Sequence, residues 1–155
     1  MKRNENLVNL SSEHHDGLVI ALRIKKSIDK TEDYQKIVNY ILHLWDTLKH
    51  HFDQEEDNFL ASKNIDQNNE LINRMLDEHQ QFDQIVNKLT SNTEDLKEIL
   101  SDFSELLNDH IRFEERELFP YIEECLTDDE LKQIGIKLEQ THQPLDKNWG
   151  PHFWD

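Results

Sequence analysis

The sequence has few residues that bend or cross-link a chain. Its 155 residues include three glycines, three prolines and one cysteine. So few glycines and prolines leave few places for sharp turns, and we therefore expect long helices. The single cysteine, Cys125, excludes an internal disulfide framework and indicates a reducing compartment.

Positive charge and long hydrophobic runs are also scarce. The formal net charge is −16, with 17 Lys and Arg against 33 Asp and Glu. This charge disfavours nucleic acid and anionic membranes as partners, because both would be repelled. No apolar run reaches the length of a signal peptide or a bilayer span, so we expect a soluble, cytoplasmic protein. The length fits one domain, residues 1–155, with a core of its own.

Apolar residues recur at helical spacing through most of the chain, and no segment alternates as a strand does. Ser11 or Ser12 can cap the first helix, Thr31 begins the second and Thr93 opens the fourth. A polar connection over residues 62–69 separates the second helix from the third. The expected helices cover about residues 11–28, 31–59, 71–89 and 93–126.

Two signals mark the end of this helical region. Pro120 cannot donate a backbone hydrogen bond and should interrupt the fourth helix near Arg116. Thr127 and Glu130 form a capping box that starts a fifth helix over about 127–141, and residues 142–155 form a non-helical tail. We therefore predict an all-α fold, an up-down-up-down four-helix bundle (about 11–126) with a short fifth helix and a C-terminal tail.

A His-x3-Glu-Glu motif occurs twice, once on the second helix and once on the fourth. His51 is followed by Glu55, and His110 is followed by Glu114. Residues four apart lie on the same face of a helix, so each motif offers one nitrogen and one oxygen to the same point. Imidazole and carboxylate without thiolate suit iron, zinc or manganese.

Each motif has a further histidine on the helix before it. His79 lies three residues before Phe82 on the apolar stripe of the third helix. The first helix is expected to bury Leu18, Ala21, Leu22 and Ile28, and it offers two neighbouring histidines. His14 fits a stripe through Leu18, Ala21 and Ile28 nearly as well. His15 stands before Leu18 as His79 stands before Phe82, which favours His15. The predicted metal ligands are His15, His51, Glu55, His79, His110 and Glu114.

Two inward glutamates favour a centre with two metal ions. Ionised carboxylates are costly to bury without compensation. Two divalent cations supply that compensation, and a carboxylate has two oxygens with which to bridge them. Two histidines and two bridging carboxylates per ion would leave open positions for a small ligand. We expect Glu56 and Glu115 to be solvated, and His43, His50 and His142 to lie outside the site.

These residues, together with the Glu-Leu-Phe-Pro segment at 117–120, resemble the hemerythrin-like family, also called the HHE cation-binding domain. The resemblance covers roughly residues 11–141. It implies a four-helix bundle with a non-haem di-iron site, two iron ions bridged by Glu55, Glu114 and an oxo or hydroxo group. The implied function is to bind or sense oxygen or a related small ligand, such as nitric oxide or peroxide.

The chain departs from the oxygen-carrying hemerythrins on the third and fourth helices. Those carriers have a His-x3-His pair on the third helix and an aspartate after the last histidine. Here Met75 and Asp83 flank His79, and Glu114 follows His110. Reversible oxygen carriage is therefore disfavoured, and the set is nearer the branch with four histidines and two glutamates, which includes iron and oxygen sensors. The alternative is a non-redox divalent metal-binding or iron-storage module, holding iron, zinc or manganese, and an oxidative enzyme is less favoured.

Overall fold

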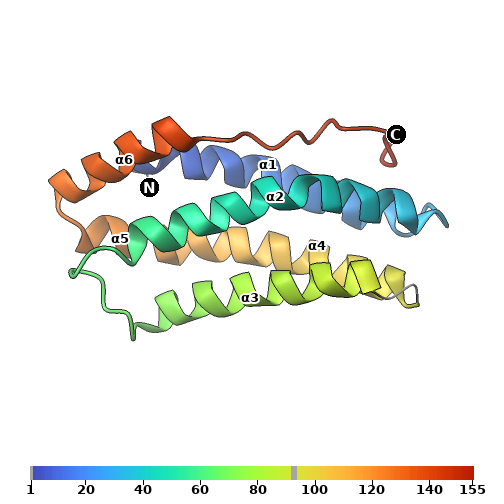
Figure 1. Ribbon diagram of the computed structural model, residues 1–155, viewed down its shortest axis with the longest axis horizontal. Helices are drawn as coiled ribbons and strands as arrows, with labels where there is room; N and C mark the ends of the chain where they lie inside the picture. Colours follow the sequence, from blue (N-terminus) through green and yellow to red (C-terminus); the bar gives the residue numbers. More distant parts are fainter. Residues whose placement is uncertain (1, 92–93) are drawn as a thin grey trace.

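Four long helices run antiparallel along the length of the molecule (Figure 1). The computed structural model describes residues 2–91 and 94–155, and within these ranges there is no strand. A short helix continues the direction of the fourth, and a further helix folds back across the start of the first. This confirms the predicted all-α, up-down-up-down bundle. The helices are α1 (Val8–Ser27), α2 (Tyr34–Phe59), α3 (Glu70–Ser91), α4 (Leu96–Phe113), α5 (Phe119–Cys125) and α6 (Asp128–Thr141).

The apolar core is divided into two clusters along the bundle axis. One cluster contains Phe52, Phe82 and Phe103, and the other contains Phe59 and Phe119. Each long helix contributes to both clusters, and it carries buried polar residues near the point where the two contributions meet. The fold therefore places a polar layer between two apolar ones, where water is excluded from both sides.

The first helix begins earlier than the sequence predicts. A 3₁₀ turn, η1 (Glu5–Leu7), leads directly into α1, and the Asn4 side chain accepts a hydrogen bond from the Asn6 backbone N–H. Leu7 and Leu10 are fully buried, so the extra turns bury apolar surface. Ser11 and Ser12 both lie inside the helix, so the predicted cap at either serine is wrong.

The buried face of α1 also differs from the expected one. The buried stripe passes through Leu10, His14, Gly17 and Ala21, whereas Leu22 is 51% exposed. A Cβ atom on Gly17 would lie 2.6 Å from Ile111 Cδ1, so this glycine lets α1 approach α4 closely. Small residues carry the contact, and the larger Leu22 faces outward.

The fourth helix changes its winding before Pro120. A π-helical turn, η2 (Glu114–Leu118), separates α4 from α5, and Pro120 lies in the first turn of α5. This confirms the predicted interruption near Arg116. Such π turns often occur at functional sites.

The starts of α2 and α4 are set by short turns. Thr31 Oγ1 accepts a hydrogen bond from the Asp33 N–H, and α2 starts at Tyr34, after the residue expected. The predicted cap Thr93 lies outside the described residues. Asp95, with a left-handed φ of 58°, precedes α4.

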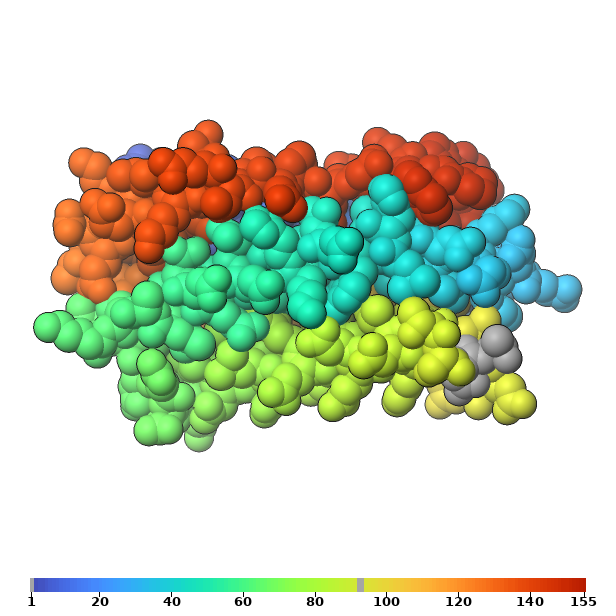
Figure 2. Space-filling model, in the orientation of Figure 1, coloured from blue at the N-terminus to red at the C-terminus, as the bar shows by residue number. Residues whose placement is uncertain are grey.

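The C-terminal part covers one long edge of the bundle. The capping box of Thr127 and Glu130 starts α6 as predicted. Residues 142–155 are non-helical and run along α1 and α2 (Figure 1), and Figure 2 shows α6 and this tail packed against α2. Among the helices of the described ranges, none is long and apolar enough to cross a membrane.

Candidate metal centre

Four histidines and two glutamates meet in the polar layer of the bundle. All six are buried, and Glu55 and Glu114 have no exposed surface. They form two groups, in each of which one ligand atom per residue lies within 4.8 Å of the others. Both groups contain both glutamates. The groups are His14, His51, Glu55 and Glu114, and Glu55, His79, His110 and Glu114.

The first helix contributes His14 to this cluster, and His15 is exposed. The choice of His15 is therefore corrected. It followed from placing Leu18 and Leu22 on the buried side. Ala21 is buried as predicted, but the stripe runs through Gly17, and Leu22 faces outward. A Glu-His pair occurs on both the first and the third helix, and it was the better signal for the ligand, because Glu13-His14 matches Glu78-His79.

The Nε2 atoms of the histidines point at the two glutamates. The Oε2 atom of Glu55 lies 3.3 Å from His51 Nε2 and 3.5 Å from His14 Nε2, and its Oε1 lies 3.3 Å from His79 Nε2. The Oε1 atom of Glu114 lies 2.9 Å from His14 Nε2 and 3.1 Å from His110 Nε2. Adjacent ligands of one ion, with bonds near 2.1 Å, are about 3 Å apart. The spacing of these atoms fits shared metal ions.

Most of these inward atoms have no hydrogen-bond partner within the described residues. They are Nε2 of His51, His79 and His110, both carboxylate oxygens of Glu55, and Oε2 of Glu114. Buried polar atoms are rarely left without partners, because the loss of hydration is costly. So many convergent, unpartnered lone-pair donors indicate that metal ions satisfy them.

The opposite ring nitrogen of every clustered histidine meets a second carboxylate. Each Nδ1 atom lies 2.7–3.1 Å from an outer glutamate. The pairs are Glu13 with His51, Glu56 with His79, Glu78 with His110, and Glu115 with His14. These pairs join α1 to α2, α2 to α3, α3 to α4, and η2 back to α1. The four pairs form a closed ring around the bundle.

This ring fixes the chemical state of the imidazoles. An ionised carboxylate only accepts hydrogen bonds, so each Nδ1–H donates and each Nε2 can present its lone pair to a metal. The prediction that Glu56 and Glu115 are solvated is wrong in part, because they are only about one third exposed and bind His79 and His14. In the sequence, the second glutamate of each His-x3-Glu-Glu motif marks the position of one of these outer carboxylates.

The charges within the cluster strongly shift the pKa values of its histidines. Burial by itself lowers the pKa of His51, but the charge of Glu55 and the close contacts of the ring nitrogens with Glu13 and Glu55 outweigh it and raise the pKa to about 9. Burial likewise opposes protonation of His79, yet the carboxylates of Glu114, Glu55 and Glu56 beside its ring nitrogens raise its pKa to about 11. Without metal, the imidazoles therefore hold protons that metal ions would displace.

The pKa values of the two inner glutamates, Glu55 and Glu114, are shifted in the opposite direction. Burial and the charge of Glu114 raise the pKa of Glu55, but the charge of His51 and the Nε2 atoms of His14 and His51 beside the carboxylate lower it to about 2. The pKa of Glu114 is well below its ordinary value, because the charge of His110 and the nearby Nε2 atoms of His110, His14 and His79 outweigh burial. Both carboxylates stay ionised at neutral pH and can bridge cations.

Neither position that flanks His79 supplies a further ligand. Met75 is fully buried in the apolar cluster next to the site, and Asp83 is exposed and pairs with Lys49 at 3.8 Å. The metal-binding groups include neither residue. Among the described residues, the potential ligands of the two groups are therefore four imidazole nitrogens and two carboxylates.

Aromatic rings shield the cluster. Phe52 stacks on His79 with ring centroids 4.2 Å apart, and Phe119 stacks on His14 at 5.1 Å. These rings come from the two apolar clusters on either side of the site. They restrict the imidazole orientations and keep bulk water away from the inward nitrogens.

Comparison with known proteins agrees with this geometry. The family model described as "Hemerythrin HHE cation binding domain" matches residues 6–122. No curated protein and no solved structure is similar enough to count as a match. The matched range contains every residue of both metal-binding groups and all four outer glutamates. The chain belongs to the hemerythrin HHE cation-binding domain family.

Proposed function

We propose that this protein holds two iron ions and uses them to bind or sense oxygen, or a related small ligand such as nitric oxide or peroxide. One observation carries the proposal: the two groups of potential ligands share both Glu55 and Glu114. Two separate mononuclear sites would have no need of common carboxylates. Shared carboxylates support a bridged pair of ions, with two imidazoles for each ion.

The residues around the cluster favour a small ligand. His14 and His51 would hold one ion, His79 and His110 the other, and the two glutamates both. Two bound iron ions supply Lewis acidity and reversible one-electron chemistry at open coordination positions. Phe52 and Phe119 pack against the imidazoles and exclude water, so the accessible space suits a diatomic molecule or peroxide better than an organic substrate.

A non-redox role is the second candidate. The same nitrogen and oxygen ligands suit zinc or manganese, and the unpartnered buried atoms would be satisfied by any of these ions. In that case the cluster would store metal or stabilise the fold. The geometry of the ligands alone supports both candidates equally, and the redox behaviour separates them.

The absorption spectrum of the purified protein in air tests the choice. Two bridged ferric ions absorb in the near-ultraviolet and visible range, whereas zinc is silent. We expect anaerobic ferrous protein to acquire such bands after one exposure to oxygen and to keep them when oxygen is removed. Absence of bands in iron-loaded protein would favour the non-redox candidate, and a return to the ferrous spectrum over several cycles would indicate an oxygen carrier.

A further inference from the structure

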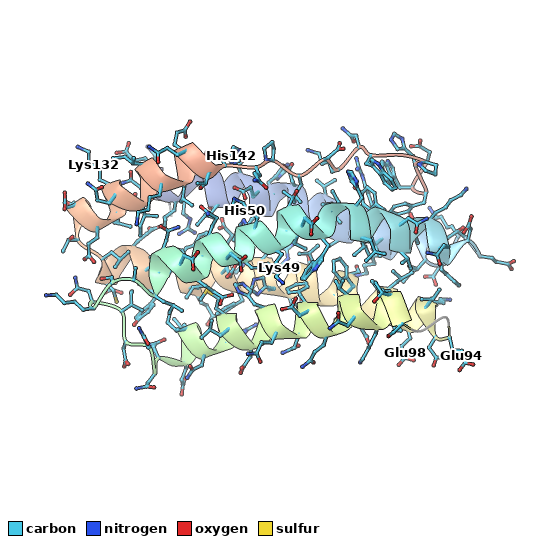
Figure 3. All side chains as sticks on the ribbon, in the orientation of Figure 1. Lys49, His50, Glu94, Glu98, Lys132 and His142 are labelled. Atoms are coloured by element: carbon cyan, nitrogen blue, oxygen red, sulfur yellow. The ribbon has the colours of Figure 1, made fainter. Side chains whose placement is uncertain are left out.

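The C-terminal tail reaches the metal centre through one side chain. His142, the first residue after α6, directs Nδ1 at Oε2 of Glu13 at a distance of 2.9 Å. The other oxygen of Glu13 lies 3.1 Å from Nδ1 of His51, which points its Nε2 at the cluster. Figure 3 shows His142 where α6 meets the tail, next to the bundle. A chain of hydrogen bonds therefore joins the molecular edge to a potential ligand.

The hydrogen-bond donors between His142, Glu13 and His51 follow from the chemistry of the three side chains. An ionised Glu13 has no proton to give, so both imidazoles donate Nδ1–H to it. The side chain of Glu13 is 6% exposed, whereas that of His142 is 31% exposed. With one oxygen held by His142, the carboxylate keeps a single orientation and holds the His51 ring in place.

The two halves of the centre differ at this point. Glu78 occupies the position in the second half that Glu13 occupies in the first, and its other partner is Arg74, four residues earlier on the same helix, at 2.9 Å. Glu13 has instead a partner from the far end of the described chain. The His79–His110 half is thus supported locally, and the His14–His51 half is supported by the tail.

The tail is docked by contacts that do not involve His142. The buried Leu145 enters the apolar core, and the Lys147 backbone carbonyl accepts a hydrogen bond from Arg23 Nη1 at 2.6 Å and another from Tyr40. Lys147 Nζ pairs with Asp16 at 2.6 Å. Removing the His142 side chain should therefore leave the tail bound.

We propose that His142 is a positioning residue, through which the docked tail sets the metal affinity of the His14–His51 half of the centre. This inference rests on the proposed two-metal function. The His142 ring supports Glu13, Glu13 orients His51, and His51 contributes its Nε2 lone pair to one ion. The His79–His110 half has no such connection to the tail in the described residues.

Stepwise binding of ferrous iron tests the inference. Anaerobic protein is titrated with ferrous iron against a competing chelator, so that two dissociation constants are obtained for each variant. We expect His142→Ala to weaken one of the two by about tenfold, the lower end of the range for partners of metal ligands, and to leave the other unchanged. His142→Asn places an amide N–H near the position of Nδ1 and should restore most of the affinity.

His50 provides a matched control, because it bonds the residue before His142. Its Nε2 donates to the Thr141 carbonyl at 2.9 Å, and His50 belongs to neither metal-binding group. Figure 3 shows it on α2 below His142. His50→Ala should leave both constants at the wild-type values, and melting temperatures of all variants report whether the fold is retained.

The outcomes separate the two proposals. Equal constants in wild type and His142→Ala, an equal loss at both ions, or the same loss in His50→Ala would overturn the positioning role while leaving the two-metal function intact. A wild-type protein that binds no ferrous iron would overturn the proposed function, and this inference with it.

Discussion

At the scale of single residues, glutamates occupy two kinds of position around the clustered histidines. The inner glutamates, Glu55 and Glu114, face Nε2 atoms, and four outer glutamates face Nδ1 atoms. The inner pair can bridge metal ions, and the outer set fixes which ring nitrogen is free to bind them. The same residue types therefore hold the metal and orient its ligands.

The choice between two adjacent histidines gives the first prediction. His14→Ala should lower metal content, because a nitrogen is removed from one group, and His15→Ala should leave it unchanged, because that side chain is exposed. Metal analysis of both variants after loading with ferrous iron and desalting measures the difference. Full retention in His14→Ala, or loss in His15→Ala, would show that the phase of α1 is wrong.

An outer carboxylate gives the second prediction. Glu56 Oε2 accepts from His79 Nδ1 at 2.7 Å, so Glu56→Ala should weaken metal binding by about 10–100-fold. Asp57 is the adjacent exposed acid, and Asp57→Ala controls for the change of charge. Competition titrations with a chelator give both affinities. Similar affinities for the two variants would mean that the hydrogen bond does not support His79.

At the scale of elements, the position of α1 depends on small residues. Gly17 and Ala21 lie against α4, where Ser104 Oγ donates a hydrogen bond to the Ala21 carbonyl at 2.9 Å. This close contact turns His14 toward the cluster and His15 toward solvent. The orientation of a ligand is thus decided by residues with almost no side chain.

Reciprocal substitutions on α1 test this packing. Ala21 is 2% exposed, so Ala21→Leu should overpack the contact and lower the free energy of unfolding by about 1–3 kcal/mol. Leu22 is 51% exposed, so Leu22→Ala should lower it by less than about 1 kcal/mol. Urea denaturation of the two variants gives both values. The opposite order would favour the stripe through Leu18 and Leu22.

The sequence predicts the elements better than their contacts. The spacing of apolar residues identifies the four long helices, and the doubled His-x3-Glu-Glu motif identifies four of the six inward residues without ambiguity. It assigns the wrong histidine on α1, because glycine leaves no apolar mark on the buried face and the apolar Leu22 faces outward. The outer ring and the docking of His142 depend on contacts between helices, which periodicity along one helix does not reveal.

At the scale of the whole molecule, protons and metal ions compete for the same cluster. The raised pKa of His51, about 9 against an ordinary 6.5, means that its ion pairs stabilise the metal-free fold fully below pH 6.5 and lose this contribution as pH rises through about 9. The lowered pKa of Glu55, about 2 against 4.5, gives a contribution that is full above pH 4.5 and is lost only toward pH 2. The metal-free cluster is therefore weakened on the alkaline side.

Metal binding needs neutral imidazoles, so its effect on stability should increase with pH. We expect the difference in melting temperature between zinc-loaded and chelated protein to grow from about pH 6.5 to about pH 8, at constant free zinc. Zinc avoids oxidation during the measurement. A difference that is constant or decreases over this range would contradict competition between protons and metal at the clustered histidines.

The proposed function depends on two metal ions that share Glu55 and Glu114. The most direct measurement is the metal-to-protein ratio after anaerobic loading with ferrous iron and removal of free metal, in wild type and in Glu114→Ala. We predict two ions per chain in wild type, and fewer in the variant, because a shared carboxylate is lost. One ion or none in wild type, or an unchanged ratio in the variant, would contradict the shared two-metal centre.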